Sequence, residues 1–400
     1  METIREFFVG TYFLIFLVLA VFGLHRYFLV YIYYRNHRST PLLREIDPLP
    51  RVTVQLPVYN EAYVVERLIE AVCGIEYPRD RLEIQVLDDS SDETGRIARS
   101  AVERFKTEGV DIKYIHRSNR EGFKAGALEN GLRTARGEFV AIFDADFIPR
   151  PGFLVETIHA FADKAVGMVQ ARWDHINRDH SLLTKIQALL LDGHFVMEHG
   201  ARFFSGRFFN FNGTAGIWRR RCIEDAGGWQ HDTLTEDLDL SYRAQLKGWR
   251  FVYLPDVTVP SEIPVEMNAF KSQQHRWTKG SIQTARKQLA GILSSRLPLK
   301  VKIESVFHLT NNFSYLCMAL LAFIIYPSIL ARFSMGWSRH LIMLTDFFVF
   351  MAATASVSAF YLCSQREIGR SVGRTLLLLP ILMSVGIGVS INNARAVLEA

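Results

Sequence analysis

The feature that most restricts how this chain can fold is the presence of long apolar segments near both of its ends. Phe7–Tyr34 is almost entirely apolar and is interrupted only by His25 and Arg26. A run of about 20 apolar residues is enough for a helix to cross a bilayer. A cleaved signal peptide would have a shorter apolar core followed by small residues, whereas bulky and aromatic residues follow here. We therefore predict a retained membrane helix with a tyrosine-rich end.

Three more apolar segments follow a long polar stretch, namely Ser305–Leu330, Leu341–Cys363 and Thr375–Ile391. Helices of a soluble core are seldom this long and this closely spaced, so four membrane helices are predicted in all. A hydrophobic content of 49% beside 22% charged residues agrees with a soluble domain joined to membrane segments.

Basic residues predict the orientation of these helices. They lie after the first apolar segment, before the second, and between the third and fourth: Arg35, Arg38, Arg44, Arg296, Lys300, Lys302, Arg366, Arg370 and Arg374. By the positive-inside rule, all of them face the cytoplasm when the polar stretch is cytoplasmic. We expect an integral protein of a plasma or inner membrane. The dispersed net charge of +5 favours a lipid bilayer over a nucleic acid as partner.

The polar stretch alternates between short β-rich runs and helix-like segments. The predicted strands are Val52–Pro57, Leu82–Leu87, Ile112–His116, Phe139–Phe143 and Val166–Ala171. The predicted helices between them are Glu61–Val72, Asp92–Lys106, Gly122–Ala135 and Phe153–Phe161. This alternation predicts a Rossmann-like α/β domain with a mostly parallel sheet. In such sheets, ligands bind beyond the carboxyl ends of the strands.

Acidic residues gather at these predicted strand ends. Asp88 and Asp89 follow the second strand, and Asp144-Ala145-Asp146 follows the fourth. Neither G-x-G-x-x-G after the first strand nor a P-loop sequence occurs, so no dinucleotide site or P-loop is indicated. Two aspartates one residue apart can present oxygens to one Mg²⁺ or Mn²⁺ that also binds phosphate oxygens and waters. An isolated pair would more often be a turn or a helix cap, but a second acidic strand end beside it favours a metal–diphosphate site.

Asp88 and Asp89 have two candidate roles. They can cap the following helix, as Asp92 is expected to do. They can also accept hydrogen bonds from a nucleobase or a ribose hydroxyl, which is the role we favour. His194, Glu198 and His199 suggest a metal site, but an amphipathic surface helix explains these three residues better.

Two further motifs lie downstream. Thr235-Glu236-Asp237 has the pattern of a capped helix start, which would also hold Asp237 rigidly enough to take a proton from an attacking hydroxyl. Gln273-Gln274-His275-Arg276-Trp277 lies on an expected amphipathic helix that begins near Met267. Its arginine can clamp a diphosphate and its tryptophan can face a sugar ring. Both residue types are also common on helices at a membrane surface.

Together, these motifs resemble the processive family 2 glycosyltransferases, which include cellulose, mannan and hyaluronan synthases. The resemblance covers about residues 52–280. The segments Phe211–Gly216 and Gln273–Trp277 look most similar to those of plant cellulose-synthase-like mannan and glucan synthases. The resemblance implies a GT-A fold, inversion at the anomeric carbon, and a requirement for Mg²⁺ or Mn²⁺.

The resemblance also implies a role for each matched residue. Asp237 would be the general base, and Asp144 and Asp146 would hold the metal. The implied ligands of the donor nucleotide and its diphosphate are Asp88, Asp89, Lys124, Asp144, Asp146, Gln273 and Arg276. The expected acceptor contacts are Trp277, Glu236 and Asn212.

The sequence therefore predicts four regions. They are a membrane helix and linker (1–45), a cytoplasmic GT-A domain (46–265), interface helices that carry Q-x-x-R-W (266–304) and three membrane helices (305–400). Four membrane helices are fewer than cellulose synthases use for a translocation channel. Export would therefore need further helices after Ala400, which would make this chain a truncated one, or a homo-oligomer.

The expected function is polymerisation of a β-linked glucan or mannan from a nucleotide sugar. UDP-glucose is the favoured donor and GDP-mannose the alternative, with a glycan or a lipid-linked sugar as acceptor. Transfer of a single sugar to a lipid, as in ceramide glucosyltransferases, is the competing enzyme hypothesis. A catalytically inactive membrane scaffold or channel is the non-enzyme hypothesis.

Overall fold

The computed structural model of the chain describes residues 2–37 and 44–400. It contains two compact units that alternate along the sequence. Unit 1 comprises Met1–His37, Ser181–Ser205 and Pro264–Ala400, and unit 2 comprises Arg38–His180 and Gly206–Ile263. The predicted region 46–265 therefore corresponds to unit 2 apart from the insertion Ser181–Ser205. Residues 38–43, which include Arg38 of the predicted linker, lie outside the described residues.

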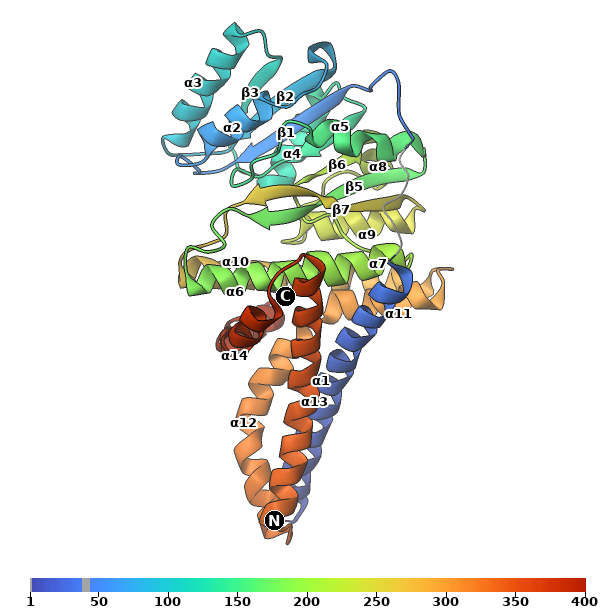
Figure 1. The fold of residues 1–400 in the computed structure, drawn as a ribbon, viewed down its shortest axis with the longest axis vertical. Helices are drawn as coiled ribbons and strands as arrows, with labels where there is room; N and C mark the ends of the chain where they lie inside the picture. The colour runs from blue at the N-terminus through green and yellow to red at the C-terminus, as the bar shows by residue number, and fades with distance from the viewer. Residues whose placement is uncertain (1, 38–43) are drawn as a thin grey trace. The chain divides into compact units, whose positions relative to one another are not determined.

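Unit 2 is built around one seven-stranded sheet (Figure 1). Its strands are β1 (Val52–Val58), β2 (Leu82–Asp88), β3 (Ile112–His116), β4 (Phe139–Ile142), β5 (Val166–His175), β6 (Gly216–Arg219) and β7 (Arg250–Ser261). Their order across the sheet is β3-β2-β1-β4-β6-β5-β7. Neighbouring strands are parallel except where β6 pairs with β4 and β5. The predicted mostly parallel α/β sheet is confirmed.

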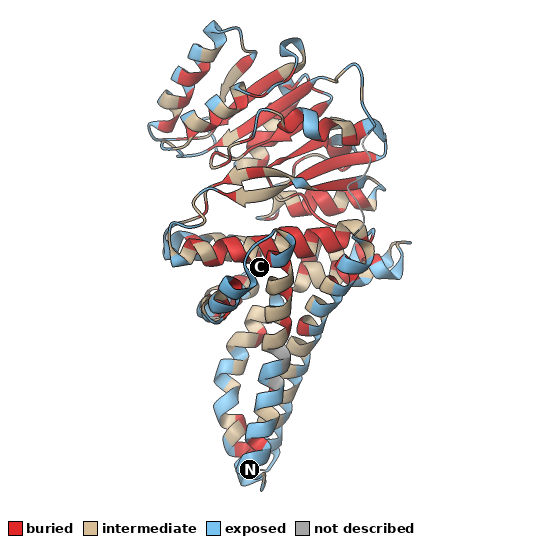
Figure 2. Cartoon of the chain, viewed as in Figure 1, coloured by how far each residue is buried: buried red, intermediate tan, exposed pale blue. Residues whose placement is uncertain are grey.

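The central strands are buried on both faces, which explains their nearly continuous runs of apolar and β-branched residues. This burial is visible as the red strands of the sheet in Figure 2. The polar residues of β1 are paired with their register partners on β2. Thr53 Oγ1 donates to Glu83 Oε2 at 2.7 Å, and Gln55 Nε2 donates to Gln85 Oε1 at 3.0 Å.

All four helices predicted between the strands are present. They are α2 (Val65–Cys73), α3 (Thr94–Thr107), α4 (Phe123–Thr134) and α5 (Phe153–Ile158), the last continued by the 3₁₀ turn η2 (His159–Ala162). The remaining helices of this unit are η1 (Arg79–Arg81), α8 (Arg220–Asp225) and α9 (Glu236–Leu246). The second of the predicted helices, α3, begins just after Asp92, whose Oδ1 accepts a hydrogen bond from the Thr94 N–H at 3.0 Å. This contact is the capping interaction expected of Asp92.

Two strands were not predicted from the sequence. The first, β6, reads Gly-Ile-Trp-Arg and so begins with a glycine and ends with a charged residue, whereas the equally short β4 is apolar throughout. The second, β7, contains Pro255, which normally argues against a strand. Its register with β5 shifts at this point, because Leu254 pairs with Ala171 whereas Thr258 pairs with Arg172. The proline therefore lies in a bulge that interrupts the ladder.

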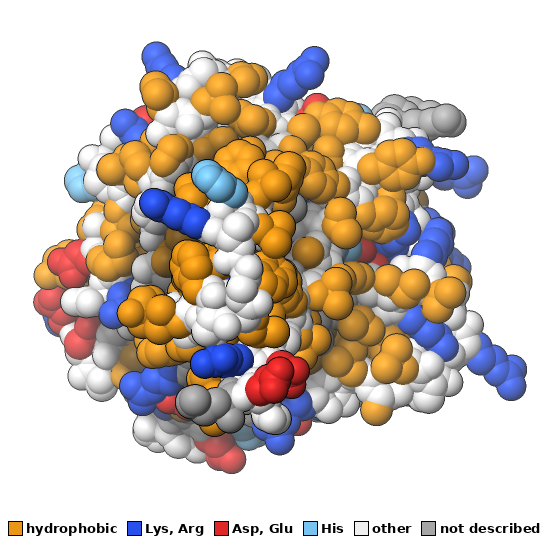
Figure 3. Space-filling view, turned by 90° about the horizontal axis from the view of Figure 1, so that it is seen from below, with side chains coloured by type: hydrophobic (Ala, Val, Ile, Leu, Met, Phe, Trp, Pro, Cys, Tyr) orange, Lys and Arg blue, Asp and Glu red, His pale blue; other side chains and the backbone are white. Residues whose placement is uncertain are grey.

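Unit 1 is helical. Its elements are α1 (Glu2–Asn36), α6 (Leu182–Asp192), the π-helix η3 (Gly193–His199), α7 (Gly200–Phe204), α10 (Met267–Ser294), α11 (Leu299–Thr310), α12 (Phe313–Ser334), α13 (Arg339–Glu367), α14 (Val372–Gly388) and α15 (Ser390–Leu398). Helices α1, α12 and α13 run side by side, whereas α6 and α10 cross their direction (Figure 1). Seen from below, hydrophobic side chains cover most of the centre of the face (Figure 3).

Among the residues that the structure describes, three segments of this unit are long and apolar enough to cross a membrane: Glu2–Asn36, Phe313–Ser334 and Val372–Leu398. They match the first, second and fourth predicted membrane segments. The predicted third segment lies within α13, whose 29 residues exceed the length that a bilayer requires. The predicted fourth segment is divided at Val389 into α14 and α15, which is a feature that hydropathy did not indicate.

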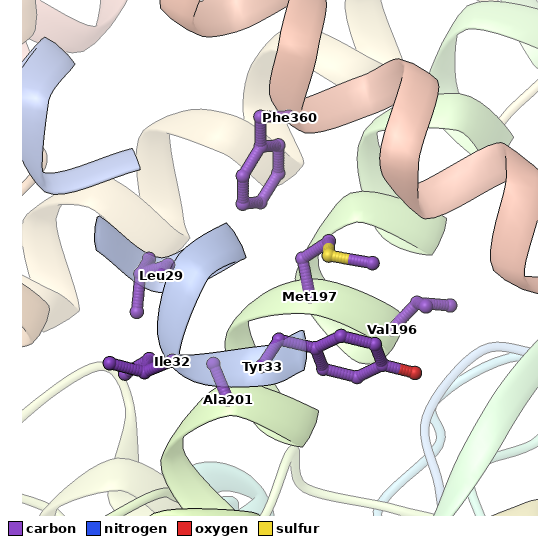
Figure 4. Packing of buried hydrophobic residues seen from close by; sticks show 7 residues of the cluster. All are labelled: Leu29, Ile32, Tyr33, Val196, Met197, Ala201 and Phe360. Atoms are coloured by element: carbon purple, nitrogen blue, oxygen red, sulfur yellow. The ribbon is translucent and has the colours of Figure 1, made fainter. Parts of the chain in front are cut away.

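The helices of unit 1 share a compact core, part of which is drawn in Figure 4. Side chains from α1, η3, α7 and α13 meet there: Leu29, Ile32, Tyr33, Val196, Met197, Ala201 and Phe360. Because these residues come from three distant parts of the chain, the insertion Ser181–Ser205 is fixed to the first helix and to α13 by burial of apolar surface.

A buried ion pair joins the three long helices. The guanidinium of Arg332 on α12 donates two hydrogen bonds to Asp346 on α13, at 2.8 and 3.0 Å. The hydroxyl of Tyr12 on α1 donates to the same carboxylate at 2.5 Å. Arg332 is completely buried, so this bidentate pair neutralises a charge that would otherwise be costly among apolar helices.

Candidate active site

The candidate site lies in unit 2, at the carboxyl ends of β1, β2 and β4. Asp88 is the last residue of β2 and is in register with Val58, the last residue of β1. Asp144 follows the end of β4. The sequence folds in this way because short parallel strands align their ends, which brings the polar residues after each strand to one edge.

Lys124 is the residue that connects the parts of this site. It lies at the start of α4, and its ammonium donates hydrogen bonds to the carboxylate of Asp144 and, at 3.0 Å, to the carbonyl of Gly213. The loop that precedes β6 makes a second contact, because the backbone N–H of Asp144 donates to Thr214 Oγ1 at 2.9 Å. Two loops distant in sequence are therefore held against one lysine.

Gly213 allows this close approach. Its φ is +82°, a conformation that favours glycine. A Cβ at this position would lie 3.2 Å from Asp237 Oδ2 and 3.3 Å from Lys124 Nζ. Asp237 lies in the first turn of α9, where its Oδ1 accepts a hydrogen bond from the Leu238 N–H at 2.8 Å. Lys124 and Asp237 therefore lie beside one glycine, and Lys124 links this glycine to Asp144.

Carboxylates outnumber cations in this cluster, and their pKa values reflect it. Burial, together with the charges of Glu236 and Asp144, raises the pKa of Asp237 to about 7. Burial and the charge of Asp144 also raise the pKa of Asp146 to about 7. The pKa of Lys124 is raised because the nearby acidic charges, Asp144 first, outweigh the effect of its burial. The cluster thus holds protons that aspartates in water would release.

The donor set suits a hard divalent cation. Asp144 and Asp146 offer carboxylate oxygens, the ligand type that Mg²⁺ and Mn²⁺ prefer. Burial first, and then the charge of Asp144, raise the pKa of Asp146, and a bound cation would favour the ionised form of this carboxyl group. A metal bound by these two carboxylates would take its other ligands from phosphate and water.

Asp88 and Asp89 are both engaged by neighbouring side chains. Asp88 is fully buried, and its Oδ2 accepts a hydrogen bond from the Tyr114 hydroxyl at 2.5 Å and lies 3.2 Å from His116 Nδ1. Asp89 accepts two hydrogen bonds from the guanidinium of Arg117. Asp88, Tyr114 and His116 belong to the lining of a cavity of about 520 Å³ beside α3. Asp88 thus lines this cavity together with residues that the sequence did not single out, whereas Asp89 is paired with Arg117.

The structure also reveals a stacked pair that sequence reasoning missed. The guanidinium carbon of Arg120 lies 3.2 Å from the ring centroid of Tyr59 and 5.0 Å from that of Phe123. Tyr59 follows β1 directly and is 38% exposed, so its ring is accessible at the same edge of the sheet. The position of Tyr59 after a predicted strand was the available signal, whereas Arg120 lies in a loop without a pattern.

The other predicted site residues fall in two places. Asn212 is in unit 2, where its N–H donates to Gln170 Oε1 at 3.0 Å beside Gly213. Gln273, Arg276 and Trp277 lie on α10, which begins at Met267 as predicted and belongs to unit 1.

The suggested metal site at His194, Glu198 and His199 has another explanation. These residues lie on η3, where His194 Nδ1 is 2.9 Å from Glu198 Oε2. Within residues 2–37 and 44–400, no three His, Cys, Asp or Glu side chains are grouped so as to hold a metal ion. The expected amphipathic surface helix is wrong, because η3 is a π-helix in which five of seven residues, including the fully buried His199, are buried.

Comparisons with curated proteins identify close relatives. Over 302 residues, the chain is 45% identical to glucomannan 4-beta-mannosyltransferase 1 of Oryza sativa, covering 73% of this chain and 57% of that protein. Over 252 residues, it is 45% identical to glucomannan 4-beta-mannosyltransferase 2 of Arabidopsis thaliana, covering 62% of this chain and 47% of that protein. The chain therefore spans about half the length of the curated relatives that it matches.

A solved structure supports the fold. The chain resembles a mannosyltransferase from Pyrobaculum calidifontis, solved in complex with GDP-mannose and Mn²⁺, with a TM-score of 0.62 and 22% identity. The similarity covers 92% of this chain and 98% of that one, which supports the predicted GT-A fold. The model of the "Glycosyltransferase like family 2" matches residues 50–280. The chain accordingly belongs to the family 2-like glycosyltransferases, in agreement with the resemblance seen in its motifs.

Proposed function

We propose that this protein transfers mannosyl units from a nucleotide sugar to a growing β-linked glycan. The observation that carries the proposal is the cluster at the strand ends of this family 2-like glycosyltransferase, in which Lys124 contacts Asp144 and Gly213, and Gly213 lies beside Asp237. This cluster combines a carboxylate able to accept a proton, a cation and one further carboxylate within one small region.

The donor that we propose is GDP-mannose. The curated relatives are named mannosyltransferases, and the fold neighbour was solved with GDP-mannose. The expectation of UDP-glucose from sequence finds no support in these names, so mannose replaces it. The exposed ring of Tyr59 and the planar guanidinium of Arg120 offer stacking surfaces suited to a purine base.

In the proposed mechanism, Asp237 removes the proton from an acceptor hydroxyl as the hydroxyl oxygen attacks the anomeric carbon. A pKa of about 7 suits this role, because the group is partly ionised near neutral pH and holds a proton well. Attack from the face opposite the departing diphosphate converts an α-linked donor into a β-linked product. A single displacement of this kind inverts the configuration and requires no covalent intermediate.

The remaining residues of the cluster would act on the leaving group. A divalent ion held by Asp144 and Asp146 would supply positive charge to the departing diphosphate. Lys124 would orient Asp144 through the hydrogen bond described above and add a second positive charge.

We assign the Q-x-x-R-W residues of α10 to the same reaction. Within the described part of the chain, the guanidinium of Arg276 makes neither a hydrogen bond nor an ion pair, so it is available to clamp the diphosphate. Gln273 would bind the diphosphate beside it, and Trp277 would face the terminal sugar of the acceptor. Asn212 and Glu236 would complete the acceptor site.

The membrane assignment rests on the three segments that are long and apolar enough to cross a bilayer. We propose that unit 2 is cytoplasmic. Basic residues follow the first predicted span and precede the second, so they lie at the two ends of the polar stretch that contains unit 2. The composition of the helices is that of a membrane protein and does not distinguish a plasma or inner membrane from another.

The test is a donor screen on the detergent-purified protein with Mn²⁺ or Mg²⁺. GDP release from GDP-mannose, its loss on chelation with EDTA, and a β-mannanase-sensitive polymer would support the proposal. UDP release from UDP-glucose alone would overturn the donor assignment. A product with one sugar on a lipid would support single-sugar transfer instead, and no turnover with any donor and added acceptor would support the scaffold hypothesis. Asp237→Asn serves as the inactive control in each arm.

A further inference from the structure

Helix α10 presents two different stripes of side chains. Residues three or four apart lie on one face of a helix, so Gln273, Arg276 and Trp277 form one stripe. Lys271, His275 and Lys279 are each four residues apart and form a second stripe. His275 is two residues from both Gln273 and Trp277, which places it roughly 160° around the helix from either of them. Gln273 and Trp277 therefore face away from the second stripe, whereas Arg276, three residues before Lys279, lies at the border between the two stripes.

The second stripe is covered by α15, which belongs to the same unit. Glu399, directly after α15, places its Oε2 at 3.3 Å from His275 Nε2 and at 3.6 Å from Lys279 Nζ. Asn392 Nδ2 on α15 donates to the backbone carbonyl of Lys271 at 3.0 Å. Contacts at three successive turns thus fix how far α10 is rotated about its own axis.

Glu399 is itself held in place for these contacts. Arg395 Nε, one turn earlier, donates to Glu399 Oε1 at 2.6 Å and leaves Oε2 to face His275 and Lys279 of α10. The hydrogen bond from Arg395 and the charges of Lys279 and His275 lower the pKa of Glu399, which keeps it ionised. Without this carboxylate, the positive charges of His275 and Lys279, four residues apart, would repel each other when the histidine is protonated.

The far side of α15 packs against α12, one of the segments long and apolar enough to cross a membrane. The side chains of His275, Lys279 and Glu399 are 28%, 25% and 33% exposed, so these ion pairs are partly shielded from water and from salt. Helix α15, which ends the apolar segment Val372–Leu398, therefore contacts both α12 and α10.

We propose that α15 is a brace that sets the rotation of α10, through the contacts of Glu399 with His275 and Lys279, so that the Q-x-x-R-W stripe faces the donor diphosphate. The inference rests on the proposed function, because it presumes that Gln273 and Arg276 bind that diphosphate. Glu399, His275 and Lys279 are positioning residues in this scheme. They act through α10 and do not contact the substrate.

The experiment compares variants of the full chain in steady-state assays with GDP-mannose. Glu399→Gln should raise the donor KM about tenfold and change kcat much less, because misplacing a diphosphate clamp weakens donor binding. His275→Gln should have a smaller effect of about threefold, since Lys279 still faces Glu399. His275→Lys supplies a permanent positive charge opposite Glu399 and should give a near-normal KM. The double variant His275→Gln/Glu399→Gln should be no worse than Glu399→Gln alone, because both changes remove one interaction.

Two controls separate this proposal from its alternatives. Glu224→Gln removes a comparable ion pair between residues four apart on α8, Arg220–Glu224 at 2.8 Å, and should leave the KM unchanged. Equal thermal midpoints of Glu399→Gln and the wild type would show that the raised KM does not result from unfolding.

The outcomes distinguish the brace from the proposed function. An active wild-type enzyme that is impaired by Arg276→Ala but unaffected by Glu399→Gln and His275→Gln would overturn the brace alone. An unaffected Arg276→Ala variant would overturn the role of the motif and the brace with it. Glu399→Gln could instead lower kcat and the thermal midpoint together and leave KM unchanged. That result would show that α15 stabilises the fold in general and does not position α10 for donor binding.

Discussion

Replacing Asp237 by asparagine should stop turnover and yet make the folded protein more stable. The substitution keeps the shape of the side chain and its acceptor for the Leu238 N–H, but removes the ionisable group. The raised pKa means that ionised Asp237 destabilises the folded state. Going from 3.8 to about 7, at ~1.4 kcal/mol for each pKa unit, gives an upper bound of ~4 kcal/mol.

We expect Asp237→Asn to gain about half of that bound. Asp237 is only half-buried, and its charge interacts with those of Glu236, Asp144 and Lys124. A gain of ~2 kcal/mol corresponds to a thermal midpoint higher by roughly 4–8 °C for a domain of this size. The sign depends on pH. Between pH 4 and 7 the folded state retains the proton more strongly than the unfolded state, so wild-type stability falls as pH rises through that window. The advantage of Asp237→Asn should therefore be full at pH 8 and nearly absent at pH 4.

The assay is thermal unfolding of the detergent-purified variants in EDTA, at pH 8 and pH 4–5, beside turnover at pH 8. Asp239→Asn is the matched control two residues away. Asp239 is fully buried and its Oδ2 is 2.8 Å from Arg243 Nε, so its loss should lower the midpoint, by breaking a buried pair. If Asp237→Asn lowered the midpoint at pH 8, or raised it equally at both pH values, the carboxyl group would not have a raised pKa and the reasoning would fail.

Three other changes have defined outcomes. Gly213→Ala places a Cβ 3.2 Å from Asp237 Oδ2 in a backbone conformation that disfavours it, and should cost about 1–2 kcal/mol of stability and much of kcat; normal kinetics would contradict this geometry. Lys124→Met removes a cation from the acidic cluster and should weaken donor binding, measured by calorimetry with GDP-mannose, and lower the thermal midpoint at pH 8 more than at pH 5. Arg332→Met leaves Asp346 unpaired and should destabilise unit 1 in detergent by about 3–5 kcal/mol, whereas Arg332→Met/Asp346→Asn should recover most of that loss; equal midpoints for the two variants would refute the pairing argument.

The sheet and the edge where the site lies could be predicted because both depend on local patterns. Apolar β-rich runs predicted β1 to β5, and parallel pairing then required Asp88 and Asp144 to emerge at one edge. Strand β6 was not predicted because only two of its four residues, Ile217 and Trp218, favour a strand, and β7 was not predicted because it contains Pro255, which lies in a bulge. These features depend on pairing with strands distant in sequence, which a local pattern cannot express.

The details of the site were less predictable, for a different reason. The engagement of Asp89 by Arg117 and the stacking of Arg120 on Tyr59 depend on the path of the loop after β3, which has no sequence signature. In the same way, the pattern of an amphipathic helix does not reveal what the helix packs against. The assignment of Ser181–Ser205 to the helical unit therefore could not be anticipated.

The alternation of the two units along the sequence has a consequence for how the protein is made. During synthesis, β4 is complete at Ile142, but β6, which lies between β4 and β5, begins only at Gly216. At typical elongation rates of 5–20 residues per second, that edge of β4 waits roughly 4–15 s for its partner. In the same interval, α6, η3 and α7 are synthesised, and η3 and α7 must pack against α1 and not against the incomplete sheet. The contacts of α1 with α12 and α13 form only after those helices are made. An unpaired strand edge exposed for seconds beside a membrane invites mispairing, so ribosome-bound chaperones and the insertion machinery should limit the yield of this protein more than the stability of its finished fold does.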